Sequence, residues 1–317
     1  TLTPDLDAFN FARFLGSLAP ANHIALRHTV GLVDAITAVD VQQRVGDGLP
    51  ETLEEVVAAT GCRYFKLKVA GNAEQDLARL TRIAEVIDRV PDYVVTLDGN
   101  EQFADAGVAA HFWEQVQATP ALQRLAAATL YIEQPLPRAT ALQSDVRALA
   151  AMRPVLIDES DGMLDAFPQA LGCGYTGVSS KDCKGIYRSL LNAARCSQLN
   201  LQATSEGRLA NYFMSAEDLT TQAGLAVQQD LALVNLIGLT HVERNGHHYV
   251  DGFSGQGGST AEAQGFLHAQ PGLYEASGDK VRLSVHDGML DITSLAAPGF
   301  AASAHPDWTT LQPLAGS

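Results

Sequence analysis

The 317-residue sequence predicts an α/β protein of the TIM-type (β/α) barrel class. Three observations support this prediction. Short β-rich runs alternate with segments of helical periodicity between residues 60 and 243. The chain is long enough for one barrel of roughly 250 residues and an appendage. Charged residues also stand at the end of each β-rich run, the position from which side chains converge on the mouth of a barrel.

The β-rich runs predict a parallel sheet, because strands that alternate with helices pair through right-handed crossovers. An open, doubly wound sheet is the alternative, but its usual glycine-rich phosphate loop after the first strand is missing here. Seven runs carry the prediction, with a weaker eighth candidate at Ile36–Val41. They are Tyr64–Val69, Tyr93–Leu97, Leu130–Ile132, Pro154–Ile157, Gly177–Ser180, Leu201–Thr204 and Leu239–Val242.

Between these runs, apolar residues recur at spacings of three and four, as expected for amphipathic helices. The pattern is clearest over Glu74–Val90 and repeats over Gly185–Gln198. A further helix is predicted to begin at Ser215, with Asp218 completing a partial capping box.

The chain divides into three predicted regions. Residues 1–35 are expected to form helix and loop leading into the barrel, and residues 36–249 form the barrel itself. Residues 250–317 form a C-terminal segment with a small hairpin, predicted from Val281–Val285 and Met289–Ile292 around the turn Asp287-Gly288.

Composition restricts the function classes. Apolar residues make up 46% of the chain and charged residues 18%, as in globular proteins, and the net charge is −15. An acidic surface argues against nucleic acid or an anionic membrane as partner, since both attract clustered Lys and Arg. No bilayer-spanning run or targeting leader is visible. The four cysteines lack CxxC spacing, so we expect reduced thiols and a cytoplasmic location.

Polar residues at the predicted strand ends should converge at one mouth of the barrel. In chain order they are Lys66, Lys68, Asp98, Asn100, Glu133, Asp158, Glu159, Lys181, Glu206, Glu243 and Asn245. Asp98, Glu133 and Asp158 supply hard carboxylate oxygens suited to Mg²⁺ or Mn²⁺. Taken singly, each acidic residue could instead cap the helix that follows it.

The lysines suggest proton transfer. Lys66 and Lys68 are two residues apart on a strand and therefore point the same way, into the mouth. Mutual repulsion and a nearby metal would lower their pKa towards neutrality, as a general base requires. Lys181 approaches from another strand, although Lys184 competes for that role from the following loop or helical turn. A metal-independent aldolase with a Schiff-base lysine is another possibility.

Taken together, these motifs resemble the enolase superfamily, and within it the muconate-lactonizing enzyme-like subgroup of the mandelate racemase/muconate lactonizing enzyme family. The matching motifs are Lys-x-Lys, Asp-x-Asn, Glu-Gln-Pro, Asp-Glu-Ser and a lysine, at residues 66–68, 98–100, 133–135, 158–160 and 181. They lie within residues 60–245 and are spaced by about one βα unit.

The resemblance implies that Asp98, Glu133 and Asp158 bind Mg²⁺, with Mn²⁺ as a substitute, and that Lys68 and Lys181 form the acid/base pair. Lys66 becomes an electrostatic helper that contacts a substrate carboxylate oxygen. Asn100, Glu159, Glu206, Glu243 and Asn245 fall where residues orient a ligand or touch the substrate. The superfamily's lysine base and Mg²⁺ act on a proton next to a carbonyl group.

The implied reaction is Mg²⁺-dependent abstraction of a proton α to a carboxylate, through an enediolate. It would make the chain an isomerase or lyase: a racemase or epimerase, a cycloisomerase or a dehydratase. The partner is then a small carboxylate substrate, and we expect a homo-oligomer. The Glu206-Gly207 pair resembles the lactonizing enzymes, whereas Glu243-Arg244-Asn245 matches the Asp-x-Asp of dipeptide epimerases only in part.

Members of this superfamily carry an N-terminal α+β capping domain, and only about 60 residues precede Lys66. We therefore expect the cap to be missing or truncated, with residues 250–317 packing on the barrel or on the cap. A non-catalytic barrel that lacks a working cap is the alternative to an enzyme.

Overall fold

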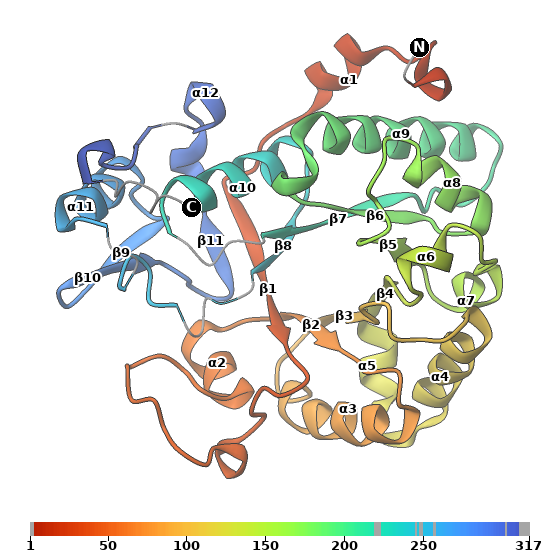
Figure 1. Ribbon diagram of the computed structural model, residues 1–317, viewed down its shortest axis with the longest axis horizontal. Helices are drawn as coiled ribbons and strands as arrows, with labels where there is room; N and C mark the ends of the chain where they lie inside the picture. The colour runs from red at the N-terminus through yellow and green to blue at the C-terminus, as the bar shows by residue number, and fades with distance from the viewer. Residues whose placement is uncertain are drawn as a thin grey trace, which may run out of the picture.

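Eight parallel strands close into a barrel in the computed structural model, which describes residues 3–218, 223–244, 246, 250–255, 258–301 and 303–310. The strands pair in chain order, and β8 pairs with β1 to close the ring (Figure 1), which confirms the predicted barrel. Their bounds are β1 His23–Val30, β2 Tyr64–Lys68, β3 Val94–Asp98, β4 Thr129–Glu133, β5 Val155–Ile157, β6 Gly177–Ser180, β7 Phe213–Asp218 and β8 His241–Arg244.

Helices follow the strands around the outside of this ring (Figure 1). They are α2 Leu53–Thr60, α3 Ala73–Ile87, α4 Ala106–Ala118, α5 Gln123–Ala128, α6 Arg138–Ala141, α7 Arg147–Met152, α8 Ala166–Cys173, α9 Ile186–Ser205 and α10 Leu225–Leu236. Single 3₁₀ turns η2 Ala38–Asp40, η3 Pro120–Leu122 and η4 Asp182–Lys184 lie in the connections.

Strand β2 shows why the barrel forms and where its polar residues go. Phe65 and Leu67 are fully buried and pack outward against apolar residues of the surrounding helices, such as Leu80 and Ile83 of α3. Because side chains alternate along a strand, Lys66 and Lys68 point into the barrel instead. The same alternation supplies the outer core and the inward charged groups from one short segment.

The first strand lies earlier in the chain than predicted. Residues 36–41 contain the one-turn helix η2, in which Thr37 and Asp40 form a capping box. The strand is His23–Val30, inside the region predicted as helix and loop. This strand is buried along nearly its whole length, but its inward-facing residues Arg27 and Thr29 are polar. The sequence therefore lacks the apolar run by which a buried strand is recognised.

The predicted strand Leu201–Thr204 is wrong, because helix α9 continues to Ser205. Helix α9 ends in a Schellman motif, in which Gly207 N–H donates to Thr204 O and Arg208 N–H donates to Ala203 O. The seventh strand is therefore β7, and the helix predicted to begin at Ser215 is wrong as well.

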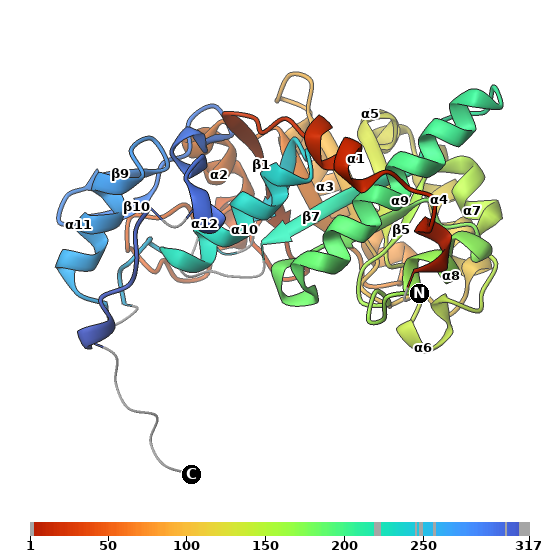
Figure 2. The same cartoon turned by 90° about the horizontal axis from the view of Figure 1, so that it is seen from above.

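The C-terminal segment packs beside the barrel, against α10 and β1 (Figures 1 and 2). Its elements are α11 Thr260–Ala269, β9 Tyr274–Ser277, β10 Lys280–Leu283, β11 Met289–Asp291, η5 Thr293–Leu295, α12 Pro298–Ala301 and η6 Trp308–Thr310. A hairpin is present, but its partners are β9 and β10. Strand β11 instead pairs antiparallel with His23–Ala25 of β1.

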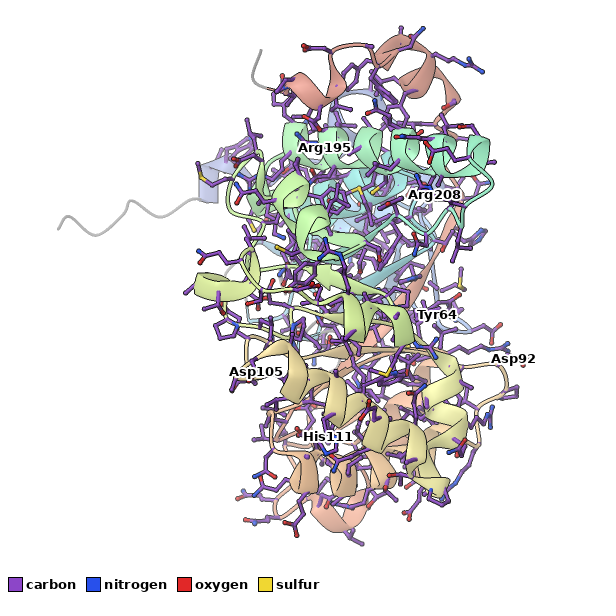
Figure 3. All side chains as sticks on the ribbon, turned by 90° about the vertical axis from the view of Figure 1, so that its right-hand side faces the viewer. Tyr64, Asp92, Asp105, His111, Arg195 and Arg208 are labelled. Carbon is purple, nitrogen blue, oxygen red and sulfur yellow. The ribbon has the colours of Figure 1, made fainter. Side chains whose placement is uncertain are left out.

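The N-terminal residues are tied to the outside of the barrel. They comprise η1 Pro4–Leu6 and helix α1 Phe11–Ser17. Arg195 of α9 lies beneath this segment (Figure 3), and its Nε donates to Asp5 at 2.7 Å. All four cysteines are free. Within the described part of the chain, every helix is too short or too polar to cross a membrane.

We expect Gly252→Ala to destabilise the protein more than Gly255→Ala. Both glycines have a left-handed φ, 59° and 72°, so alanine at either position is strained by about 1–2 kcal/mol. A Cβ on Gly252 would also lie 2.0 Å from Val281 O of β10, whereas no atom of the described residues lies within 4 Å of a Cβ on Gly255. The added clash should lower the free energy of unfolding by a further ~1–3 kcal/mol, measured by urea denaturation. Equal losses would show that β10 does not pack against Gly252.

Candidate active site

A single ammonium group lies at the centre of the polar barrel interior. Lys66 Nζ is 2.9 Å from Asp98, 3.0 Å from Glu133, 3.4 Å from Glu217 and 2.5 Å from Glu243. These carboxylates come from β3, β4, β7 and β8, and Lys66 itself is fully buried. One side chain of β2 therefore joins carboxylates from four other strands.

Two of these carboxylates stand directly opposite each other. Glu217 of β7 and Glu243 of β8 are cross-strand partners, an arrangement that like charges disfavour. Lys66 contacts both, and Thr29 Oγ1 donates to the second oxygen of Glu243 at 2.6 Å. The cation between the two glutamates offsets their repulsion.

Lys68 lies nearer the mouth. Its Nζ donates to Asp98 Oδ2 at 2.6 Å, and 21% of its side chain remains exposed. The backbone N–H of Asn100 donates to the other Asp98 oxygen at 2.8 Å, while the Asn100 side chain donates to Glu159 at 3.1 Å. Asn100 therefore orients Asp98 through its backbone and Glu159 through its amide.

Two lysines approach Asp158 from the β6 side. Lys181 Nζ is 2.7 Å from Asp158 Oδ2 and 2.8 Å from Glu217. Lys184 Nζ is 3.0 Å from Asp158 Oδ1 and also donates to the main-chain oxygens of Asp158 and Ser179, each at 2.8 Å. Lys181 thus lies across the carboxylate cluster from Lys68, while Lys184 lies against the backbone.

The donor set fits a divalent metal. Glu133 Oε2 is buried and has no hydrogen-bond partner among the described residues, so this oxygen is left for a ligand. One oxygen each of Glu133, Glu217 and Glu243 lie within 4.8 Å of one another. Asp98 ends β3 and Asp158 directly follows β5, the strands on either side of β4, but neither aspartate belongs to this group of three. All these oxygens are the hard donors that Mg²⁺ and Mn²⁺ prefer.

The pKa of Lys66 moves opposite to the expectation, and the pKa of Lys181 also rises. Burial alone would lower the pKa of Lys66, but Asp98, Glu133 and Glu243 outweigh it and hold that pKa well above its ordinary value. For Lys181, Asp158 and Glu217 likewise overcome burial and raise the pKa. The predicted lowering is therefore wrong for Lys66, because the nearby carboxylates outweigh burial.

The pKa values of two predicted metal ligands, Glu133 and Asp158, shift in opposite directions. Burial raises the pKa of Glu133 to about 8, and Lys66 opposes this only in part. Burial also acts to raise the pKa of Asp158, but Lys184 and Lys181 outweigh it and hold that pKa below its ordinary value. Neighbouring ammonium groups thus offset the effect of burial at Asp158 but not at Glu133. A further cation beside Glu133 would stabilise its charged form.

A second polar layer lies below the carboxylates. The guanidinium of Arg27 is 2.6 Å from His241 Nδ1 and donates to Ser215 Oγ and Ala216 O, each at 3.0 Å. Since Arg27 can only donate, His241 Nδ1 must accept, which requires a neutral imidazole. Burial, followed by the charge of Arg27, lowers the pKa of His241 to about 3.

Most of the predicted site residues come together, with two exceptions. Glu206 caps the C-terminus of α9, where it is exposed and pairs with Arg208 at 2.5 Å, so its predicted place at the mouth is wrong. Asn245 lies outside the described residues, as do His247 and His248. Glu243, predicted as a substrate or ligand-orienting residue, is buried against Lys66.

Sequence reasoning missed Glu217, Arg27 and Thr29, because the strands that carry them were misplaced. Gly207 was the available signal for Glu217. A glycine after a long periodic segment marks a helix end, and the next strand should be sought beyond it.

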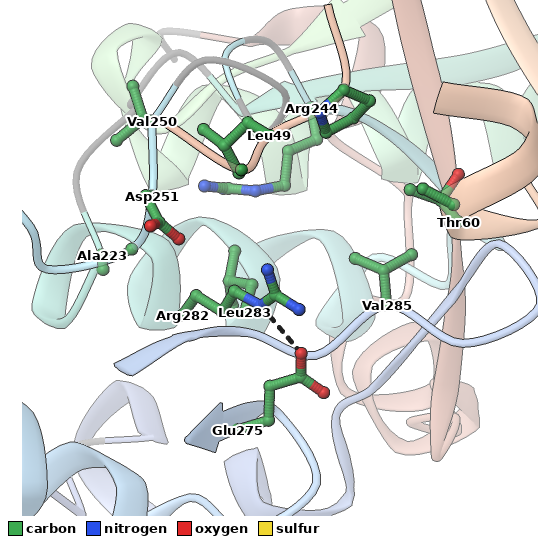
Figure 4. Close-up of a pocket in the computed structure, with 14 residues that line it drawn as sticks. Leu49, Thr60, Ala223, Arg244, Val250, Asp251, Glu275, Arg282, Leu283 and Val285 are labelled. Carbon is green, nitrogen blue, oxygen red and sulfur yellow. Dashed lines mark hydrogen bonds and ion pairs between the residues drawn. The ribbon is translucent and has the colours of Figure 1, made fainter. Parts of the chain in front are cut away.

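A separate cavity lies outside the barrel, between β8 and the C-terminal segment (Figure 4). Arg244, Arg282 and Glu275 are among its lining residues, and Arg282 Nε donates to Glu275 at 2.9 Å. The lysine–carboxylate cluster does not contribute to its walls.

Residues 48–256 match the profile of a protein family described as Enolase C-terminal domain-like. The match covers more than half of the 317 residues, so the chain belongs to this family. The enolase-superfamily resemblance of the motifs is thereby confirmed. A comparison with curated protein sequences found no match.

Solved structures share the fold at low sequence identity. A mandelate racemase/muconate lactonizing protein from Herpetosiphon aurantiacus is 20% identical, with a TM-score of 0.54, over 87% of this chain and 65% of its own. A dipeptide epimerase from Enterococcus faecalis V583 is 16% identical, with a TM-score of 0.52, over 88% and 65%. An enolase from Bradyrhizobium complexed with magnesium and mandelic acid is 17% identical, with a TM-score of 0.52, over 94% and 63%. The chain therefore spans just under two thirds of the length of these relatives.

The neutral His241 predicts a pH-dependent stability. Its pKa is lower in the folded chain than the ordinary value near 6.5, so the stability it contributes is present above pH 6.5. Below that pH His241 binds a proton in the unfolded chain but stays neutral in the folded chain. The free energy of unfolding should therefore fall by up to about 1.4 kcal/mol per pH unit between pH 6 and 4.

His241→Asn is the matched control, because its amide oxygen can accept from Arg27 without titrating. Urea denaturation of both proteins across this range should give a shallower slope for the variant, since other groups contribute equally to each. Parallel slopes would contradict a buried, neutral His241.

Proposed function

We propose that this chain catalyses Mg²⁺- or Mn²⁺-dependent removal of a proton α to the carboxylate of a small acid. The arrangement of two lysines around one carboxylate cluster supports this proposal. Lys68 reaches the cluster through Asp98, and Lys181 reaches it through Asp158 and Glu217 from the other side. A substrate between these two ammonium groups would present one lysine to each face of its α-carbon.

Asp98, Glu133 and Asp158 would hold the metal, as the family resemblance implies, with Glu217 and Glu243 close to Glu133. A bound divalent cation supplies Lewis-acid catalysis, because it stabilises the negative charge that develops on the substrate carboxylate. The raised pKa of Glu133 and its unpaired Oε2 support a need for a cation beside this residue.

The three lysines have different capacities for proton transfer. Lys66 is fully buried and surrounded by carboxylates, so it stays charged and stabilises negative charge electrostatically. Lys68 is the most exposed of the three and faces the mouth, where it can reach a substrate. Lys181 is 11% exposed and can act from the opposite side. If one lysine removes the α-proton and keeps it, while the other donates its own ammonium proton to the opposite face, the α-carbon is inverted, which supports an isomerase over a lyase.

We expect the wild-type protein with Mg²⁺ to exchange the α-proton of at least one acid into D₂O, followed by NMR. The panel should include mandelate and a dipeptide. Lys68→Ala and Lys181→Ala should each slow exchange about 10²- to 10⁴-fold, because each removes a general base. The two losses should fall on opposite enantiomers.

Lys280→Met is a control, since Lys280 pairs with Asp251 on the C-terminal segment, away from the barrel interior. It should exchange at the wild-type rate. Undiminished exchange in both active-site variants, or none by the wild type with any acid, would contradict the proposal.

Removal of the metal should abolish exchange, and Mg²⁺ or Mn²⁺ should restore it. Metal at 100 times its dissociation constant should also stabilise the folded chain by about 2.7 kcal/mol, measured by thermal unfolding with and without EDTA. Exchange that resists EDTA and is trapped by borohydride would instead indicate a Schiff-base lysine.

A further inference from the structure

Asp158 directly follows β5, the shortest strand of the barrel. Strand β5 has only three residues, and it pairs with each neighbouring strand at two positions. Asp158 follows its last residue, so the sheet itself does little to fix the direction of this carboxylate. Two side chains hold the main-chain groups of this residue instead. Gln134 accepts from the Asp158 N–H at 2.8 Å, and Lys184 donates to the Asp158 C=O at 2.8 Å.

Lys184 uses all of its hydrogen-bond donors on Asp158 and Ser179. An ammonium group has three N–H donors. They meet three oxygens: Asp158 O at 2.8 Å, Asp158 Oδ1 at 3.0 Å and Ser179 O at 2.8 Å. Two of these are main-chain carbonyls near the ends of β5 and β6. Lys184 therefore joins two strand ends and one carboxylate oxygen at a single point.

Gln134 holds the other side of the same turn. It has a positive φ of 32°, and its Oε1 accepts from Asp158 N and Ser160 N at 2.8 and 3.1 Å. Its Nε2 donates to Leu136 O and Ser160 Oγ, each at 2.8 Å. This buried amide thus makes four hydrogen bonds, which tie the segment after β4 to the turn after β5.

We propose that Lys184 is a positioning residue which, together with Gln134, fixes the Asp158 carboxylate as a metal ligand, and that it takes no part in proton transfer. The inference rests on the proposed function, because it assigns Asp158 to the metal. Lys184 binds Oδ1 and leaves Oδ2 facing Lys181 and the interior. A proton carrier needs a free lone pair that reaches the substrate, and Lys184 directs its donors to the backbone and to Oδ1.

The test compares Lys184→Met, Lys181→Met and the control Lys280→Met by Mn²⁺ titration followed by electron paramagnetic resonance, alongside proton exchange. Loss of a residue that orients a ligand weakens metal binding about 10- to 100-fold, and we expect this rise in the Mn²⁺ dissociation constant for Lys184→Met. Its exchange should recover at saturating Mn²⁺. Lys181→Met should bind Mn²⁺ and remain inactive at saturation.

Wild-type Mn²⁺ affinity in Lys184→Met would overturn the proposal, as would loss of exchange that saturating Mn²⁺ does not restore. If circular dichroism shows that Lys184→Met is unfolded, Lys184→Arg takes its place. The N–H groups of a guanidinium lie in one plane, so they cannot reach all three oxygens that surround the Lys184 ammonium. Weaker Mn²⁺ binding is again expected, and wild-type affinity overturns the proposal.

The proposed function can fail separately. A wild type that binds Mn²⁺ but exchanges no acid contradicts the reaction, while the Mn²⁺ affinities still decide the role of Lys184. A wild type that binds no Mn²⁺ overturns both proposals.

Discussion

The ammonium group of Lys66 and the four carboxylates within 3.4 Å of it form the contact on which the barrel interior depends. Glu217 and Glu243 face each other on adjacent strands, and in a water-excluded interior they would repel strongly without a cation between them. Removal of one partner from a buried ion pair typically costs about 3–5 kcal/mol. The geometry of the site and the closure of the barrel therefore depend on the same side chain.

The polar interior is organised in layers. Above lie the lysines and carboxylates; below them Arg27 joins His241, Ser215 and Ala216. The charge of Arg27 acts upward on Glu243 and Glu133, while its hydrogen bonds go to neutral groups. The guanidinium of Arg27 below and the lysine ammonium groups above thus both offset the negative charge of the carboxylate cluster. The nearby cations hold the pKa values of Glu243 and Asp158 below their ordinary values, while burial still raises that of Glu133.

The sequence predicted the middle of the barrel well, because β2 to β6 combine apolar outward residues with a charged residue at or just beyond the strand end. The prediction failed at β1, because the polar residues Arg27 and Thr29 made this segment look like a loop. It also failed at β7, because helix α9 continues past its predicted end. Glu217 was lost with β7. The lysine pKa shifts could not be read from sequence, since their sign depends on how many carboxylates surround each lysine in three dimensions.

Strand β1 has a consequence for how the chain folds during synthesis. It pairs with β8, where Ala25 lies opposite His241, and also with β11, still further along the chain. Such contacts are slow to form because a long loop must close first. A nascent chain that has emerged only as far as β7 can form an open sheet, with β1 and β7 as unpaired edges. Exposed edges of this kind invite association with other chains. The first strand of the barrel is thus completed only when nearly all of this sequence has left the ribosome.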